Sequence, residues 1–465
     1  MNNVHSAIYL LFQIFTADPA TVVDLMPQAD IDRSVNDLSV RIGTTGDKRH
    51  KLGFVVGPLS FNHSDDEVKR LIVQSFEIAR RRNMAVAFHI DDSMFWDKRK
   101  DLIENKENVE WINWNGGCST GRRLDWGPKP TRVAPQMCFN SPAIKLAVSK
   151  RAELIGTEIK HQIDKLNQEG KQELFAGVIA GWETQLGRDF DSNRSTGYHA
   201  LFNKGLRSTS SNVQNDQARV EIVQSFIELW ARSLHSAGIP IEKIYSHIAF
   251  TSQGIDGASA PPPPPGAASS SYAQQVNFAE PSVSFGKSYL PGFSTYPEEG
   301  AIEQICKQVA IHGNPPWISA EGTNVVPSGI KGEATMETYL AKMFNHGAVA
   351  INIFSWGMGG EAQKENFFRK ATENPEALGA YRKFLEGRPL LEQSRPASQF
   401  SPKRLQEKIR TIQAQAPAWM QTSANQYSRI RFQSLMQRLD SAIKSNRFED
   451  ADLISTEVLK MIEKK

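Results

Sequence analysis

A short apolar run followed by an amphipathic stretch recurs about eight times along this chain of 465 residues. This alternation is typical of βαβ units, which set their strands side by side in a parallel sheet. Several of the runs are rich in β-branched and aromatic residues, as expected where both faces of a strand are covered. The predicted strands are Ala7–Phe15, Gly53–Leu59, Met84–Ile90, Phe175–Trp182, Ile244–Ser252, Ser288–Tyr296, Trp317–Glu321 and Ala348–Trp356.

Between these runs, apolar residues recur at helical spacing, and the ends of several stretches carry capping signals. Ser141 and Pro142 stand where an N-cap and a first-turn proline belong, and Gly313 and Gly347 are candidate C-caps. Eight strands alternating with helices favour a closed (β/α)8 TIM barrel of the α/β class over an open sheet. No glycine-rich dinucleotide fingerprint follows any strand. The predicted helices are Asp65–Arg82, Ala143–Leu166, Gln217–Ala237, Glu299–His312 and Thr335–His346.

Two long insertions and a polar tail complete the expected organisation. Residues 97–140 are rich in Trp, Gly and Arg, and residues 254–280 contain the run Pro261–Pro265, which reads as a flexible or polyproline loop. Both insertions follow a strand, on the side where the active sites of barrels lie. We expect a barrel domain over 1–395 and a helical C-terminal extension over 396–465, which could mediate formation of a homo-oligomer or cover the barrel.

The composition argues against two classes of partner, nucleic acids and membranes. The net charge is +3, from 54 basic and 51 acidic residues, which offers no case for nucleic acid. No apolar run reaches the roughly 18 residues that would cross a membrane. No Lys or Arg precedes the apolar run at Ala7–Phe15 and no small-residue cleavage site follows it, so we interpret it as a strand. The compartment stays open: periplasmic or extracellular if a signal was removed, otherwise cytoplasmic.

The three cysteines give no metal or redox signature. Cys118, Cys138 and Cys306 show no C-x-x-C spacing, so neither a zinc site nor a redox pair is expected. A disulfide between Cys118 and Cys138 and a pair of free thiols remain equal alternatives. No cofactor is expected.

Two glutamates directly follow predicted strands. Glu183 ends the fourth strand in the sequence Ala-Gly-Trp-Glu, and Glu321 ends the seventh in Ile-Ser-Ala-Glu. Residues at the carboxyl ends of barrel strands line the active site. A pair of carboxylates across a pocket suits cleavage of a glycosidic bond, since one protonates the leaving oxygen and the other attacks the sugar or activates water. The alternative is that each glutamate only pairs with a neighbouring Lys or Arg at the rim.

At these residues the chain resembles the clan A (β/α)8 glycoside hydrolases, over roughly residues 7–360. The resemblance implies Glu183 as acid/base, Glu321 as nucleophile, and net retention at an equatorial linkage, taken here as a β-D-galactosidic or β-D-glucosidic one. It also implies that Trp356 floors the sugar subsite and that Tyr296 contacts the nucleophile. Where that clan usually has Asn before the strand-four Glu, this chain has Trp182.

A second barrel type keeps another mechanism open. The β-amylase type also carries its two glutamates after strands four and seven, yet inverts. The separation of the carboxyl groups distinguishes the two: about 5 Å indicates retention and about 6.5–9.5 Å indicates inversion.

The third strand ends in His89, followed by Asp91 and Asp92, and this cluster has three interpretations. The side chains could bind sugar hydroxyls, bind a metal for a metal-dependent barrel hydrolase, or form a hydrogen-bonded pair that only supports a loop. Further candidates for binding an oligosaccharide or glycoside substrate are Gln13, Trp96, Trp182, Tyr296, Asn324 and Trp356. Aromatic faces stack on the apolar faces of pyranose rings, and strand-end amides can bind hydroxyls.

Overall fold

The computed structural model describes most of the chain. The described residues are 7–16, 28–122, 132–192, 194–249, 281–295, 301–323, 335–354, 375–390, 402–422, parts of 432–444, and 448–463. The chain divides into two compact units, Met1–Glu392 and Gln393–Lys465, which are described separately below.

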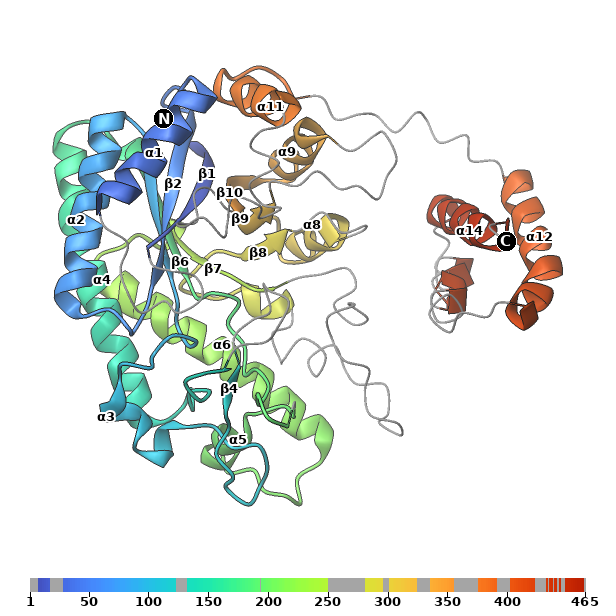
Figure 1. Cartoon of the computed structure of the whole chain (residues 1–465), viewed down its shortest axis with the longest axis horizontal. Coiled ribbons are helices and arrows are strands. Elements are labelled where there is room, and N and C mark those ends of the chain that lie inside the picture. The colour runs from blue at the N-terminus through green and yellow to red at the C-terminus, as the bar shows by residue number, and fades with distance from the viewer. Residues whose placement is uncertain are drawn as a thin grey trace. The chain divides into compact units, whose positions relative to one another are not determined.

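The first unit is built on eight parallel strands (Figure 1). Their order in the sheet is β7-β6-β3-β2-β1-β10-β9-β8, and every neighbouring pair in it is parallel. The strands are β1 Ile8–Phe15, β2 His50–Leu59, β3 Ala85–Ile90, β6 Phe175–Ala180, β7 Ile244–Ser246, β8 Gly292–Thr295, β9 Trp317–Thr323 and β10 Ala348–Phe354.

Main-chain hydrogen bonds between the two ends of this sheet close it into a barrel. The amide of Ser246 donates to the carbonyl of Leu290, that of Ile248 donates to Gly292, and that of Ser294 donates back to Ile248, at 2.9–3.0 Å. We call this contact the closing seam. At Gly292 an added Cβ would lie 2.0 Å from the Ser246 carbonyl oxygen, so the close approach requires glycine. The predicted closed barrel and its eight strands are confirmed.

Helices connect most of the strands and pack around the outside of the barrel (Figure 1). All five predicted helices are present, with ends shifted by a few residues in four of them. Among the described residues of this unit, four helices were not predicted: α1 between β1 and β2, α11 after β10, and two short helices, Lys100–Ile103 and Tyr198–Asn203. The helices are α1 Gln28–Ile42, α2 Asp65–Arg82, α4 Pro142–Gln168, α6 Asn212–Ser236, α8 Ala301–Ile311, α9 Met336–Asn345 and α11 Pro375–Leu385.

Capping interactions explain where several of these helices begin and end. The Ser64 hydroxyl accepts the amide of Glu67, and the Glu67 carboxylate accepts the amide of Ser64, which forms a capping box at the start of α2. Asn83 ends α2 in the left-handed conformation. Ser141 occupies the predicted N-cap of α4, but its hydroxyl donates to the side chain of Asn108 instead of capping the helix.

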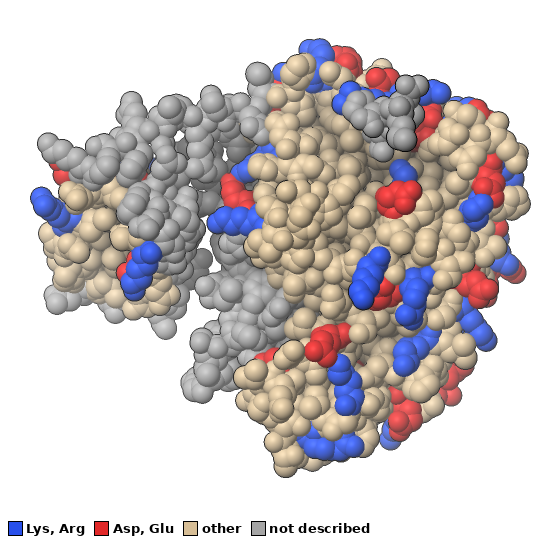
Figure 2. All heavy atoms as spheres, turned by 180° about the vertical axis from the view of Figure 1, so that it is seen from behind, with Lys and Arg blue, Asp and Glu red and all other residues tan. Residues whose placement is uncertain are grey.

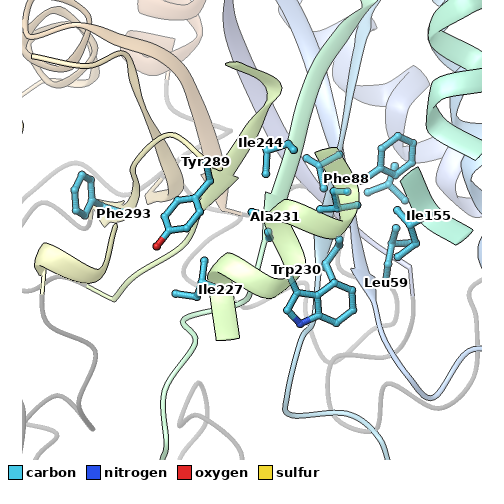
Figure 3. Packing of buried hydrophobic residues seen from close by; sticks show 14 of the residues in the cluster. Leu59, Phe88, Ile155, Ile227, Trp230, Ala231, Ile244, Tyr289 and Phe293 are labelled. Atoms are coloured by element: carbon cyan, nitrogen blue, oxygen red, sulfur yellow. The ribbon is translucent and has the colours of Figure 1, made fainter. Parts of the chain in front are cut away.

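Apolar side chains pack in two zones, one on each side of the barrel wall. The larger zone lies between strands and helices, where Trp230 and Ile227 of α6 pack near Phe88 and Ile244 of the strands (Figure 3). The smaller zone fills the barrel interior with alternate strand residues such as Tyr9, and includes Leu11, Val55, Ala87, Ile179, Ile318 and Ala350. Along β1 the next inward position after Tyr9 and Leu11 is Gln13, so the interior becomes polar toward the carboxyl ends of the strands.

The described part of the insertion after β3 contains regular structure. It includes α3 Lys100–Ile103, the short 3-10 helix η1 Lys106–Asn108, and an antiparallel pair of β4 Gly121–Arg122 and β5 Arg132–Val133. Trp111 of this insertion stacks on His199 of α5 Tyr198–Asn203, with ring centroids 4.0 Å apart. The predicted loop at 254–280 lies outside the described residues. Cys118, Cys138 and Cys306 are all free thiols.

The second unit is helical. It contains α12 Pro402–Thr422 and α14 Phe448–Glu463, which share an apolar cluster that includes Ile412, Phe432 and Val458. A 2.8 Å ion pair between Lys408 and Asp452 joins α12 to α14.

The surface shows no strong charge segregation on the face drawn in Figure 2, where acidic and basic side chains intermingle over the first unit. Among the described residues, no helix is long and apolar enough to span a bilayer.

Candidate active site

A strained turn after β6 presents Glu183. Gly181 has φ +105°, and Glu183 itself has φ 52°, a left-handed conformation that is rare for a residue with a side chain. Asp92 holds this turn from behind, because its carboxylate accepts hydrogen bonds from the Thr184 hydroxyl at 2.7 Å and from the Trp182 amide at 3.3 Å. Strain of this kind persists where the surroundings enforce it, and it clusters at functional sites.

A bulge in β9 presents Glu321. Phe293 of β8 pairs with Ser319, while the next residue of β8 pairs with Glu321, so Ala320 is an extra residue on β9. The pairing with β10 shifts in the same place. The side chain of Asn352 on β10 donates a 2.8 Å hydrogen bond to the Ala320 carbonyl. Bulges redirect side chains next to active sites, and here the bulge sets the position of the Glu321 carboxylate.

The turn and the bulge bring the two carboxyl groups together inside the barrel mouth. An oxygen of Glu183, an oxygen of Glu321 and a ring nitrogen of His247 all lie within 4.8 Å of one another. Glu183 is 8% exposed, while Glu321 and His247 are fully buried. The two glutamates that were singled out in the sequence therefore form one cluster with His247.

Burial dominates the electrostatics of this cluster. It raises the pKa of Glu183 above its usual range, and the Ser294 hydroxyl opposes that rise. Burial, followed by the nearby charge of Glu183, raises the pKa of Glu321 well above its usual range. Two carboxyl groups this close cannot both ionise easily, so the pair tends to keep a proton between them.

Two residues of the cluster were missed in the sequence. His247 follows β7, with its Nε2 atom 3.8 Å from Glu321 Oε2 and 2.9 Å from the Ser294 hydroxyl. Ser294 lies on β8 and also contacts Glu183 Oε1 at 2.7 Å. Both residues fall inside predicted strands, and His247 stands two positions after the inward-facing Tyr245, which was the available signal.

A line of buried polar groups extends from His247 across the barrel. His89 Nε2 lies 3.0 Å from His247 Nδ1 and 3.1 Å from the Gly181 carbonyl oxygen. His89 Nδ1 lies 3.1 Å from Gln13 Oε1, which also accepts a 3.0 Å hydrogen bond from the side chain of Asn352. Burial lowers the pKa of His89 to about 3, and that of His247 well below its usual range.

Aromatic rings border the polar cluster. Trp182 stacks on His89 with ring centroids 4.2 Å apart and planes 5° from parallel. Phe15 and Phe354 pack against Trp182 at 6.0 and 6.1 Å. Trp182 is only 3% exposed, so its ring faces protein on most of its surface.

Several predicted substrate-binding side chains are occupied by protein contacts. The carboxylate of Asp91 accepts the amides of Ser93, Met94 and Phe95, and it thereby holds the start of the loop. Trp96 is fully buried, and its Nε1 donates to the Pro135 carbonyl at 2.9 Å. The placement of Asp91 and Asp92 is the one expected if the cluster after β3 supports loops. Their predicted sugar contacts, and that of Trp96, stay predictions.

The metal set considered from the sequence is not assembled. Both ring nitrogens of His89 face protein groups, and the carboxylates of Asp91 and Asp92 are held by the hydrogen bonds described above. The donor types at Glu183, His247 and Glu321 could suit a divalent cation. However, the Ser294 hydroxyl already bridges Glu183 Oε1 and His247 Nε2, so we do not assign a metal there.

Tyr296, Asn324 and Trp356 lie outside the described residues. Each follows the carboxyl end of a barrel strand in the sequence: Tyr296 comes directly after β8, Asn324 directly after β9, and Trp356 two residues after β10. Their predicted substrate contacts stay predictions.

Comparison with known proteins finds weak similarity to solved structures. No protein-family model and no curated protein sequence matches the chain. Among solved structures, it is similar to the catalytic domain of a β-amylase from Paenibacillus polymyxa, with 6% identity, a TM-score of 0.49, and coverage of 82% of this chain and 98% of that one.

Two further solved structures show the breadth of the similarity. A sugar phosphate isomerase/epimerase from Parabacteroides distasonis matches with 8% identity and a TM-score of 0.37, covering 83% of this chain and 98% of that one. A broad-specificity endoglucanase from Ruminococcus champanellensis matches with 12% identity and a TM-score of 0.35, covering 79% and 90%. With identities and TM-scores this low, these similarities do not indicate the function of this chain.

Proposed function

We propose that this protein is a glycoside hydrolase that uses Glu183 and Glu321 as its catalytic carboxylates. The observation that carries the proposal is the meeting of these two buried glutamates, within 4.8 Å, at the carboxyl ends of β6 and β9. Active sites of (β/α)8 barrels lie at this end, and glycosidic cleavage needs a pair of carboxyl groups. Burying two carboxyl groups side by side costs stability, so a role in chemistry explains why the chain keeps them.

In the proposed mechanism Glu183 acts as general acid and Glu321 as nucleophile. Glu183 donates its proton to the glycosidic oxygen while Glu321 attacks the anomeric carbon, which breaks the bond to the leaving group and forms a glycosyl-enzyme ester. Glu183, now a carboxylate, then takes a proton from water as the water displaces Glu321. The separation of the carboxyl groups supports retention, since inverting enzymes leave room for a water between theirs.

The substrate in this proposal is an oligosaccharide or glycoside with an equatorial linkage, β-D-galactosidic or β-D-glucosidic. This part rests on the resemblance of the two glutamate positions to the clan A enzymes. A panel of aryl α- and β-glycosides tests it. Turnover of α-glycosides alone would overturn the equatorial assignment while leaving the two-carboxylate proposal standing.

Azide rescue is the experiment that tests the roles. Glu183→Ala should lose turnover on substrates with poor leaving groups, and added azide should restore it by forming a β-glycosyl azide in place of the acid/base step. Glu321→Gln should lower kcat by about a thousandfold or more, and added azide should not yield the β-glycosyl azide with this variant. Glu110→Gln, which removes another fully buried carboxyl group distant from the pair in sequence, is the matched control and should retain activity.

Three outcomes would count against parts of this proposal. Retention of more than about a tenth of the activity in Glu321→Gln would exclude its nucleophile role. Formation of the inverted anomer, seen by proton NMR of the first product, would favour an inverting enzyme with the same pair. Loss of activity in chelator, with recovery on adding a divalent metal, would favour a metal-dependent hydrolase instead.

A further inference from the structure

We propose that Ser294, His247 and His89 form a proton relay that links the protonation of Glu183, which follows β6, to the protonation of His89 on the neighbouring strand β3. This inference rests on the proposed function only for its purpose, because the relay itself is a property of the free protein. The three residues are positioning residues, since they act on Glu183 and not on the substrate.

The relay is a continuous line of short contacts. Glu183 Oε1 lies 2.7 Å from Ser294 Oγ, which lies 2.9 Å from His247 Nε2. His247 Nδ1 lies 3.0 Å from His89 Nε2. All the members except Glu183 are 0–1% exposed, so water does not compete for these contacts.

At the His89 end of the line, the hydrogen-bond donors and acceptors are fixed. The side-chain amide of Asn352 donates to the Ala320 carbonyl and to Gln13 Oε1, so Gln13 presents an acceptor oxygen to His89. His89 Nδ1 therefore carries a proton and donates it to Gln13 Oε1. At the other nitrogen of His89 stand the Gly181 carbonyl, which can only accept, and His247, which can do either.

The other end of the line has no fixed direction, because Ser294 has a single hydroxyl proton for two acceptors. It can donate to Glu183 Oε1 or to His247 Nε2, but not to both at once. The choice made at Ser294 propagates through His247 to His89, since each neutral imidazole carries one proton and must donate from one nitrogen and accept at the other.

In the first arrangement the proton is on Glu183. The carboxylic acid donates to Ser294, the Ser294 hydroxyl donates to His247 Nε2, and His247 Nδ1–H donates to His89 Nε2. Both imidazoles are neutral, as their deep burial favours. In this arrangement Glu183 is ready to act as an acid, although the Gly181 carbonyl faces a nitrogen of His89 without a proton.

In the second arrangement one proton has moved along the line. Glu183 gives its proton to Ser294 Oγ, Ser294 passes its own proton to His247 Nε2, and His247 passes the Nδ1 proton to His89 Nε2. Glu183 is then a carboxylate and His89 an imidazolium, so the total charge is unchanged. His89 now donates to Gln13 Oε1 from one nitrogen and to the Gly181 carbonyl and His247 from the other. Burial opposes the charge on His89, so this proton leaves to solvent as the pH rises. The loss leaves Glu183 ionised and both imidazoles neutral, with the His247 proton on Nε2.

The charged and titratable groups around the line are few among the described residues. β9 contributes Glu321, β3 contributes His89 itself, and the loop after β3 contributes Asp92, which bonds to the turn after β6. β8 contributes only hydroxyl groups at Ser294 and Thr295. Ionised Glu321 beside His247 favours a proton on Nε2 of that ring, so the charge of the nucleophile biases the relay toward the second arrangement.

The test is nuclear magnetic resonance of the full chain with 15N-labelled histidine and 13C-labelled glutamate side chains. Ring 15N shifts distinguish the two neutral tautomers from the imidazolium, and Glu183→Gln, His89→Gln and His247→Gln assign the signals. In the wild-type protein the ring signals of His247 should pass from the Nδ1–H to the Nε2–H tautomer with the same pH midpoint as the carboxyl signal of Glu183. Histidine signals that stay constant while Glu183 titrates would overturn the relay.

Ser294→Ala should break the link. The carboxyl group of Glu183 should still titrate, at a higher midpoint because it has lost a donor to its ionised form, while the tautomer of His247 stops following it. Ser294→Thr keeps the hydroxyl and should restore the link. Ser319→Ala is the matched control, because it removes another buried hydroxyl that bonds to Thr295 and not to Glu183. A link that survives in Ser294→Ala would also overturn the proposal.

These readouts remain valid if no glycoside is ever hydrolysed, so the relay and the proposed function can fail separately. Where turnover is found, Ser294→Ala should shift the alkaline limb of the pH profile of kcat and leave KM for an aryl glycoside within about twofold. An unchanged alkaline limb would show that the relay has no part in catalysis.

Discussion

The Oδ2 atom of Asp92 accepts a 2.7 Å hydrogen bond from the Oγ1 atom of Thr184, although the two residues stand 92 positions apart. Through this contact the loop after β3 holds the turn after β6, and with it the backbone that carries Glu183. The two aspartates that follow β3 therefore belong to the support of the site.

Asp92→Asn should lower kcat about 10- to 100-fold and leave KM nearly unchanged. The variant keeps the volume of the side chain but weakens a hydrogen bond to a charged acceptor, which is worth about 1.5–3 kcal/mol, and lets Glu183 move from its position. Steady-state kinetics of Asp92→Asn, Thr184→Val and Thr184→Ser would check this. Since Thr184→Ser keeps the hydroxyl, equal losses in Thr184→Ser and Thr184→Val would contradict the explanation.

The backbone strain at Glu183 predicts an unusual ranking of stability. Because Glu183 has φ 52°, replacing it by glycine should give a protein about 1 kcal/mol more stable than replacing it by alanine. Both variants lack the carboxyl group, so the comparison isolates the backbone. Thermal unfolding of the two variants measures it, and an alanine variant at least as stable as the glycine variant would mean that the turn relaxes.

Activity should depend on pH with a bell-shaped profile whose limbs both lie above the usual range of a glutamate. The proposed mechanism needs one proton on the pair, carried by Glu183 while Glu321 is ionised. Burial raises the pKa of both groups, and in the free protein the charge of Glu183 raises that of Glu321 further, so the two groups titrate as a pair. Activity therefore rises as the pair loses its first proton and falls at higher pH as it loses its second. Measurement of kcat/KM on an aryl glycoside across about pH 4–9 checks this, and a flat profile would count against the pair.

Stability of the barrel unit should fall as the pH rises from about 4.5 to 7. Burial, opposed by the amides of α5 that it accepts, raises the pKa of Glu110 to about 7. The folded state thus holds a proton that the unfolded state releases earlier, and the stabilisation present below the ordinary pKa is lost as the pH passes about 7. The change corresponds to at most about 3 kcal/mol.

Glu110→Gln should remove much of that dependence. Thermal unfolding at pH 5 and pH 7.5 would show a smaller difference in midpoint for the variant than for the wild type. Some dependence should remain, because burial and the neighbouring Asp92 raise the pKa of Asp91 to about 7 as well. A difference as large as that of the wild type would indicate that Glu110 is already ionised at pH 5.

The sequence predicts the strands and the position of the two glutamates because both depend on local patterns. Apolar runs identify the strands, and a polar residue directly after a run falls at the mouth of a barrel. The pattern also marks His247 as inward-facing, two residues beyond Tyr245. It does not give the angular position around the barrel, so the contact between His247 and His89, 158 residues apart, could not be read from it.

Two other features of the site could not be predicted from the sequence, for a different reason. The bulge at Ala320 and the left-handed turn at Glu183 violate the regular period on which strand prediction depends, and neither position carries a glycine that would mark it. The roles predicted for Asp91 and Trp96 assumed that polar and aromatic residues in a rim loop face a ligand. The sequence did not show that their side chains also bond to the backbone of the loop itself.

The closing seam between β7 and β8 has one further consequence. His247 stands on one side of this seam and Ser294 on the other, so the last strand contact that completes the barrel also brings these two side chains within 2.9 Å. If the seam frays, as short strand pairs do in local opening, the hydroxyl and the imidazole separate together with the backbone. The protonation of Glu183 would then depend on local opening of the barrel at this seam. Hydrogen exchange at the amides of Ile248 and Ser294 would measure how often the seam opens.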